Sequence, residues 1–114
     1  MIKDLFKSID SKDVNEFSTF CSDDVSFVFG NTDPLNGKDS VKTMLERFNN
    51  SIDSVSYNIF KVWDQENDII VQGEVSYTRL DNTILKVPFG NIFKMKNSLI
   101  KDYLIYVDTS MLYA

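Results

Sequence analysis

The stretch that decides the fold runs from Ser54 to Asp108 and reads SVSYNIFKVWDQENDIIVQGEVSYTRLDNTILKVPFGNIFKMKNSLIKDYLIYVD. β-Branched and aromatic residues fill four runs, at 55–63, 69–79, 84–95 and 99–107, with short polar turns between them. Strands joined by tight turns pair antiparallel, and strands this long twist and curl until helices close the open side. The stretch predicts an α+β fold, in which a strongly curved antiparallel sheet wraps around N-terminal helices to form a cone with an internal pocket.

The residues before this stretch predict three helices and one short strand. The first helix carries an apolar stripe of Ile2, Leu5, Phe6 and Ile9; the second has Asp10 or Ser11 as its N-cap and a stripe of Val14, Phe17, Phe20 and Cys21. A strand at 25–29 and a loop at 32–37 follow. The longest helix, 38–50, is expected to pack into the concave side of the sheet.

Alternation along the strands predicts which side chains face the interior. We expect the apolar sets to point inward, among them Val55, Tyr57, Ile59 and Trp63 on the first long strand and Leu85, Val87, Phe89, Asn91 and Phe93 on the third. This orientation requires an odd-numbered loop at 80–82, for example a type I turn with Asn82 left-handed. A two-residue turn would instead aim Gln72 and Glu74 into the pocket. The last strand is apolar on both sides, which favours a homodimer formed through its outer face.

Composition narrows the chemistry that this chain can perform. Its 114 residues are expected to form one domain, 1–114, and a net charge of −5 with scattered basic residues argues against nucleic-acid binding. The sequence contains no apolar run that could span a membrane, and polar residues interrupt the apolar ones at the N-terminus, so no membrane partner and a cytoplasmic location are predicted. Histidine is missing and Cys21 is the one cysteine, so no metal centre and no cofactor are predicted. Acid–base chemistry would therefore rest on Asp, Glu, Tyr or Lys.

Several strings in this order resemble the SnoaL-like branch of the nuclear-transport-factor-2-like superfamily. They are 23–27 (DDVSF), 30–31 (GN), 36–38 (NGK), 73–82 (GEVSYTRLDN), 87–93 (VPFGNIF) and 105–108 (IYVD). The resemblance covers nearly the whole chain and implies the cone fold. The superfamily includes ketosteroid isomerases, polyketide cyclases, limonene-epoxide-type hydrolases and non-catalytic binding proteins, so the shared fold does not imply one function.

Two activities of these relatives find poor support in the residues. The hydrolases hold their water with a Tyr, an Asn and an Asp, and the resemblance puts Phe29, Asn31 and Ile105 at those places. The isomerases need a carboxylate base and hydroxyl or carboxylic-acid donors. Asp33, before Pro34, is a candidate base, although Asp-Pro also forms a plain turn, which we favour.

The remaining candidates leave three functions open. Asp108 follows an apolar strand where the cone opens, so it could act as a catalytic acid or base or simply cap the following segment. The side chains expected to bind a substrate are Phe29, Asn31, Tyr57, Phe89, Asn91 and Tyr103. The leading hypothesis is a domain that binds a small apolar or amphipathic molecule. The alternatives are a lyase, isomerase or cyclase that uses Asp108, and a non-catalytic dimerisation scaffold.

Overall fold

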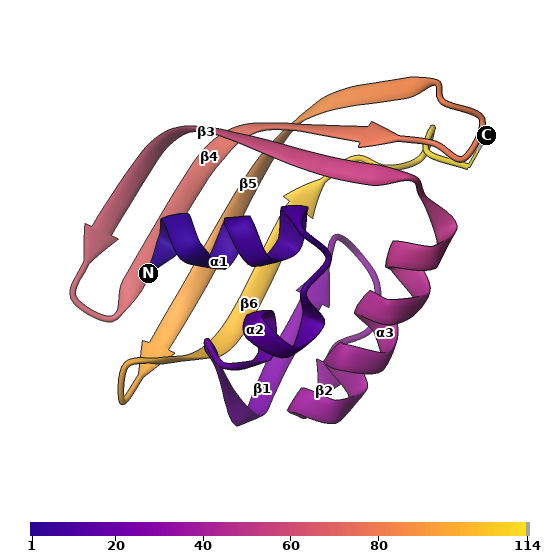
Figure 1. Cartoon of the computed structure of the whole chain (residues 1–114). Coiled ribbons are helices and arrows are strands. Elements are labelled where there is room, and N and C mark those ends of the chain that lie inside the picture. Colours follow the sequence, from indigo (N-terminus) through magenta and orange to yellow (C-terminus); the bar gives the residue numbers. More distant parts are fainter. Residues whose placement is uncertain (114) are drawn as a thin grey trace.

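The computed structural model describes residues 1–113 and contains three helices in front of a six-stranded sheet (Figure 1). The helices are α1 (Ile2–Asp10), α2 (Val14–Ser18) and α3 (Lys38–Ser51). The strands are β1 (Cys21–Phe29), β2 (Leu35–Asn36), β3 (Ser54–Gln65), β4 (Asp68–Thr78), β5 (Ile84–Lys96) and β6 (Leu99–Val107). They lie in the order β2-β1-β6-β5-β4-β3, antiparallel except for the parallel pair of β1 and β6.

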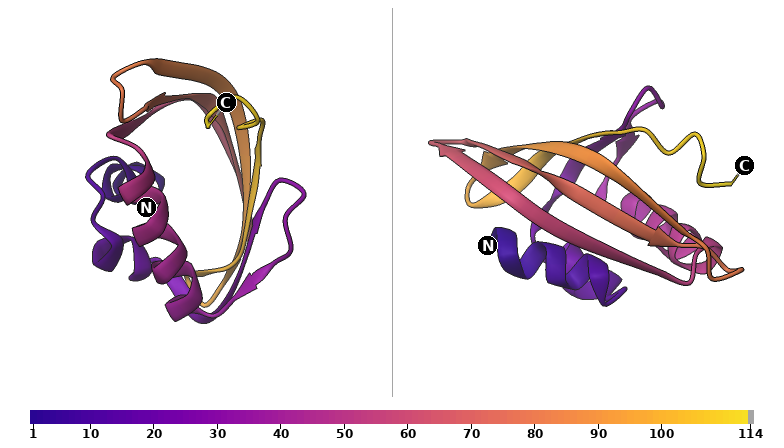
Figure 2. Two further views of the ribbon diagram at one scale, coloured as in Figure 1. Left: turned by 90° about the vertical axis from the view of Figure 1, so that its right-hand side faces the viewer. Right: turned by 90° about the horizontal axis from the view of Figure 1, so that it is seen from above.

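The sheet bends around the helices, and all three helices lie on its concave side (Figure 2). Long twisted strands cannot remain flat, and the helices bury the apolar face that the bend creates. The prediction of an α+β cone, in which a strongly curved sheet wraps around N-terminal helices, is confirmed, and the sheet does not close on itself.

The turn between β4 and β5 has the odd length that the inward orientation needs. The Arg79 amide donates to the Thr83 carbonyl over 2.8 Å, and Asn82 between them has a φ of 69°. Val71 and Val75 are consequently buried on the concave side, whereas Gln72 is exposed. The prediction that the apolar set of this strand faces inward is therefore confirmed.

The orientation predicted for the far end of β3 is wrong, because a β-bulge interrupts the strand. The register shifts between Ile59 and Lys61, so that Val62 pairs with the inward-facing Val71. Trp63 therefore lies on the convex face, with the Lys61 ammonium 4.9 Å from its ring centroid. After one inserted residue, every following side chain points to the opposite face of the sheet. The residues around the bulge give no sign from which the insertion could have been predicted.

Two predicted boundaries near the N-terminus also change. The side chain of Asp13, not of Asp10 or Ser11, caps α2 by accepting from the Glu16 amide over 3.0 Å. Cys21 begins β1 instead of ending the helix, and its burial raises the pKa of the thiol to about 11. A thiol that stays protonated and buried packs as a small apolar group and is a poor nucleophile.

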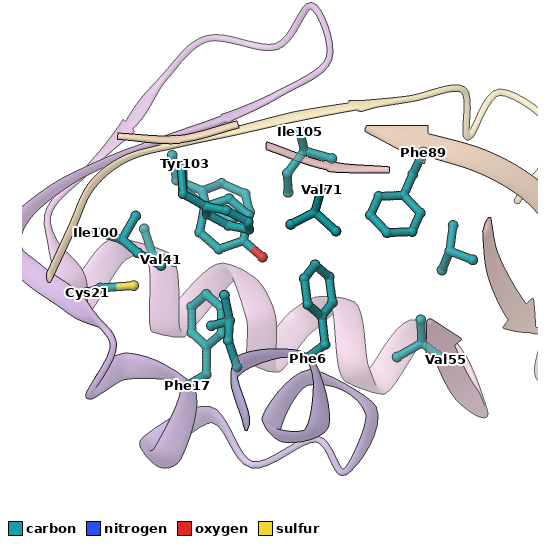
Figure 3. Close-up of a cluster of buried hydrophobic side chains, with 14 of the residues drawn as sticks. Phe6, Phe17, Cys21, Val41, Val55, Val71, Phe89, Ile100, Tyr103 and Ile105 are labelled. Carbon is teal, nitrogen blue, oxygen red and sulfur yellow. The ribbon is translucent and has the colours of Figure 1, made fainter. Parts of the chain in front are cut away.

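Aromatic side chains connect the helices to the sheet. Phe6 and Phe17 point from α1 and α2 toward the concave face, where Tyr103 and Phe89 lie (Figure 3). The Phe17 ring centroid lies 5.8 Å from that of Tyr103, which in turn lies 4.6 Å from Phe93. These contacts hold α1 against β3 and β5 and α2 against β6.

Candidate ligand pocket

A cavity of about 380 Å³ lies between the helices and the concave face of the sheet. Its walls come from every helix, from five of the six strands and from the segment after β6, and most of the lining side chains are apolar. The lining residues are Ile9, Phe17, Phe27, Phe29, Thr32, Asp33, Leu35, Met44, Leu45, Phe48, Tyr57, Tyr77, Tyr103, Ile105, Thr109, Leu112 and Tyr113. A cavity of this size and character is typical of a site for a small organic molecule.

Three tyrosines supply hydroxyl groups to this apolar wall. Tyr57, Tyr77 and Tyr103 come from β3, β4 and β6, each at an inward position of its strand. Burial raises the pKa of Tyr77 to about 12 and raises the pKa values of Tyr57 and Tyr103 well above their ordinary value. Neutral phenols at physiological pH can both donate and accept hydrogen bonds, so they can orient a polar atom of a ligand.

Asn91 is a further buried polar group on the concave face. It pairs with Val71 on one side and Ile105 on the other, and only 1% of its surface is exposed. Its Oδ1 atom has no hydrogen-bond partner among the residues that the structure describes. A buried amide oxygen without a partner is costly. Asn91 does not line the cavity, however, so its expected place in the pocket is wrong.

The structure brings together some of the predicted site residues and separates others. Phe29, Tyr57 and Tyr103 line the cavity. Phe89 lies behind the wall, with its ring centroid 5.0 Å from that of Tyr57. Asn31 is exposed in the turn after β1 and does not line the cavity, so its expected place in the pocket is wrong. A side chain two residues beyond the inward Phe29 would share its face only if the strand continued, and β1 ends at Phe29.

The expected position of Asp108 is also wrong. Its side chain is exposed, and Oδ1 accepts a 2.9 Å hydrogen bond from the Ser110 amide. This bond from the Ser110 backbone lowers the pKa of the carboxyl group, the opposite of the shift expected for a half-buried acid. Asp108 therefore has the local capping role, and its neighbour Thr109 lines the cavity instead.

Two other carboxylates lie closer to the cavity. Asp33, in the loop after β1, is one of the lining residues. Asp10, at the end of α1, accepts a long 3.4 Å hydrogen bond from the Tyr57 amide, and its other oxygen is buried without a partner among residues 1–113. Burial raises the pKa of Asp10. Its position next to β3 was missed because Asp10 also fits the pattern of a helix cap.

The segment 109–113 folds back over the cavity and is held in place by Arg79. The guanidinium donates to the Leu112 carbonyl through Nε and to the Met111 carbonyl through Nη2, both over 3.0 Å. Tyr113 adds a 2.6 Å hydrogen bond to the Ser51 hydroxyl at the end of α3. Leu112 is buried as a result, so this segment forms part of the cavity wall.

Replacing Arg79 by methionine is expected to destabilise the protein by about 1–2 kcal/mol, because the Leu112 and Met111 carbonyl groups lose a charged donor in a partly exposed site. Urea unfolding followed by fluorescence measures the loss. The matched control is Arg47→Met, which removes an exposed arginine from α3 and should change the stability by less than about 0.5 kcal/mol. Equal losses in the two variants would show that Arg79 does not hold the segment.

Among residues 1–113, no cluster of three or more His, Cys, Asp or Glu side chains is placed to hold a metal ion. No helix within residues 1–113 is both long enough and apolar enough to cross a bilayer. No curated protein matches the sequence.

Solved structures share the architecture at low sequence identity. An NTF2-like protein of unknown function from Burkholderia pseudomallei superposes with a TM-score of 0.89 at 13% identity, covering 97% of this chain and 90% of that one. A putative polyketide cyclase from Xanthomonas campestris gives 0.87 at 14% identity, with coverages of 97% and 90%. An epoxide hydrolase of Mycobacterium tuberculosis that is described as LEH-like gives 0.83 at 11% identity, with coverages of 96% and 80%.

These neighbours differ in the activities that their descriptions name, so they share the fold with this chain and nothing more specific. The family model described as the SnoaL-like domain matches residues 2–103, which include all three helices and most of the sheet. With a curved sheet, covering helices and a cavity between them, the chain belongs to the SnoaL-like family.

Proposed function

We propose that this protein binds a small, largely apolar molecule in the cavity between its helices and its sheet. The observation that carries the proposal is an unfilled space of about 380 Å³, since protein interiors normally close such spaces. The tyrosine hydroxyls give the apolar wall a few polar contacts, the combination that fixes the orientation of a bound molecule.

Catalysis through Asp108 is not part of this proposal. A general acid or base must reach the reacting atom, and the Asp108 carboxylate is instead exposed and bonded to the Ser110 amide. Binding requires only the cavity and its polar groups, so it is the function that the geometry supports best.

Filling the cavity should abolish binding. Leu45 lines the cavity from α3, and Leu45→Trp places a much larger side chain in the same space. With the neutral dye Nile red as the probe, we expect a fluorescence increase with the wild-type protein and at least a tenfold weaker affinity in the variant. Glu46→Trp, on an exposed position of the same helix, is the matched control and should bind as the wild type does. Dye binding that both variants retain unchanged would contradict the proposal.

We further propose that two copies associate through the convex face of the sheet. The helices leave this face uncovered, and cross-strand pairing aligns an apolar row across it, formed by Trp63, Ile70, Ile92, Leu104 and Val28. A second row, formed by Asp68, Lys94 and Asp102, alternates in charge beside the first. A two-fold arrangement can set Lys94 of each copy against an acid of the other, so a second copy suits this face.

A lysine in the middle of the apolar row should separate the two copies. We expect Ile92→Lys to halve the mass measured by light scattering at about 10 μM protein, because the new charge would be buried without a partner in the dimer. Thr43→Lys on the exposed side of α3 is the control and should leave the mass unchanged. A wild-type protein that is already monomeric at 100 μM would contradict this proposal.

A further inference from the structure

The charge distribution of the cavity wall is one-sided. Among the seventeen lining residues, Asp33 is the one with a formal charge at neutral pH, and the set contains no lysine or arginine. The chain as a whole carries a net charge of −5, which adds a weak long-range attraction for cations.

Two basic side chains close to the wall in the sequence, those of Lys12 and Arg79, are engaged elsewhere. The Lys12 ammonium donates to the Asn49 and Ile52 carbonyl oxygens over 2.9 Å and 3.1 Å. The Arg79 guanidinium is turned to the carbonyl groups of 111 and 112 and to the Thr83 hydroxyl. An anionic ligand would therefore enter a space of low polarity without a partner of opposite charge, which is strongly unfavourable.

Aromatic rings supply most of the rest of the wall. Eight of the lining residues are Phe or Tyr, and neighbouring rings are tilted against one another, with an interplanar angle of 44° for Phe27 and Tyr103 and 86° for Phe48 and Tyr77. Tilted rings turn electron-rich faces in several directions, and such faces attract organic cations. The tyrosine oxygens add acceptor sites to the same surface.

The raised pKa of the tyrosine hydroxyl group also indicates that this wall disfavours a negative charge. Burial first, and then the neighbouring Tyr77, Tyr103 and Asp10, raise the pKa of Tyr57. The wall therefore resists a negative charge at the place where a ligand would sit, since a raised phenol pKa means that the anionic form is disfavoured there.

Resting on the proposed function, we infer that the pocket selects its ligand by charge: it takes a small organic cation, an ammonium group on an apolar body, and rejects an anion of the same size. The apolar body lies among the rings, and the ammonium group lies toward Asp33. A quaternary or tertiary ammonium suits the site best, because it is weakly hydrated and loses little on leaving water.

Three probes of one shape and different charge separate this inference from the proposed function. They are benzyltrimethylammonium, the neutral neopentylbenzene and the anionic phenylmethanesulfonate, each measured by displacement of Nile red. We expect the cation to bind at least tenfold more tightly than the anion. The Asp33→Asn variant should reduce that ratio at least threefold. Asp39→Asn, an exposed acid on α3 that does not line this cavity, should leave all three affinities unchanged.

The outcomes are distinct for the two ideas. Binding of the neutral probe with equal affinities for the cation and the anion would overturn charge selection and leave the pocket's binding function standing. An equal effect of Asp33→Asn and Asp39→Asn would also overturn it, since the selection would then come from the overall charge. If none of the probes displaces the dye and the dye itself does not bind, the proposed function fails, and the charge preference fails with it.

Discussion

Replacing Gly73 by alanine is expected to destabilise the protein by about 3 kcal/mol or more. Gly73 lies on the concave side of β4, opposite Ile59 of β3, at the edge of the bulge. A β-carbon added there would overlap the Asn58 carbonyl oxygen and would lie 3.0 Å from both the Ile59 Cα and the Phe89 ring. Two of these three neighbours are backbone atoms, which cannot rotate away, so the strands themselves would have to separate.

The same contact explains why the effect should be large in this fold. The close approach of β3 to β4 at Gly73 accompanies the register shift after Ile59, where the edge strand bends over the helices. Bulges increase the local twist and bend of a strand, and a glycine without a side chain permits the two backbones to come close. The substitution therefore acts on the curvature of the sheet as well as on local packing.

Gly90→Ala provides a matched control in the neighbouring strand. A β-carbon at Gly90 would have the Val71 carbonyl oxygen as its nearest neighbour, at 4.0 Å, which is an ordinary contact. That variant should be unchanged or slightly more stable, because alanine restricts the unfolded chain more than glycine does. Urea unfolding of the two variants and the wild type measures the difference in their free energies of unfolding. A loss of less than about 1 kcal/mol in Gly73→Ala would show that the strands adapt.

Alternation of apolar and polar residues was sufficient to predict the orientation of β4 and β5. Both strands keep a strict two-residue period, and the left-handed Asn82 in the turn between them connects the two in the required register. The end of β3 escaped prediction because the bulge at Phe60 changes the period without a glycine or proline to mark it. The sequence therefore determines inward positions well only along strands whose pairing is uninterrupted.

The site was harder to predict than the fold, because its walls come from segments far apart in the sequence. Tyr57 and Tyr103 were accessible to pattern reasoning, since each lies at an inward position of a long strand. The contribution of Leu112 depends on the backbone carbonyl groups of 111 and 112 meeting Arg79, more than thirty residues earlier. No local pattern encodes such a contact, and the same holds for the approach of Asp10 to the Tyr57 amide.

Phe6→Ala is expected to destabilise the protein by about 3–5 kcal/mol, the usual cost of removing a buried phenylalanine ring. Phe6 is 3% exposed and joins α1 to the sheet through three rings, with centroids at 4.9 Å for Tyr57, 5.8 Å for Phe89 and 6.2 Å for Phe93. Domains of this size are stable by about 5–15 kcal/mol, so the variant should unfold at a much lower urea concentration. Lys3→Ala, on the exposed side of the same helix, should change the stability by less than about 0.5 kcal/mol.

Substitutions of Phe6 and Tyr57 test whether α1 also determines the shape of the cavity. Tyr57 lines the cavity and contacts Phe6. Phe93 also contacts Phe6, but it does not line the cavity. A double-mutant cycle with Phe6→Leu and Tyr57→Leu should give a coupling energy of about 0.5–1.5 kcal/mol, since the two rings are in direct contact. Phe6→Leu alone should weaken Nile red binding, because Tyr57 loses the ring that fixes its position. Independent effects of the two substitutions, together with unchanged dye affinity, would mean that α1 only covers the sheet and does not position the wall of the pocket.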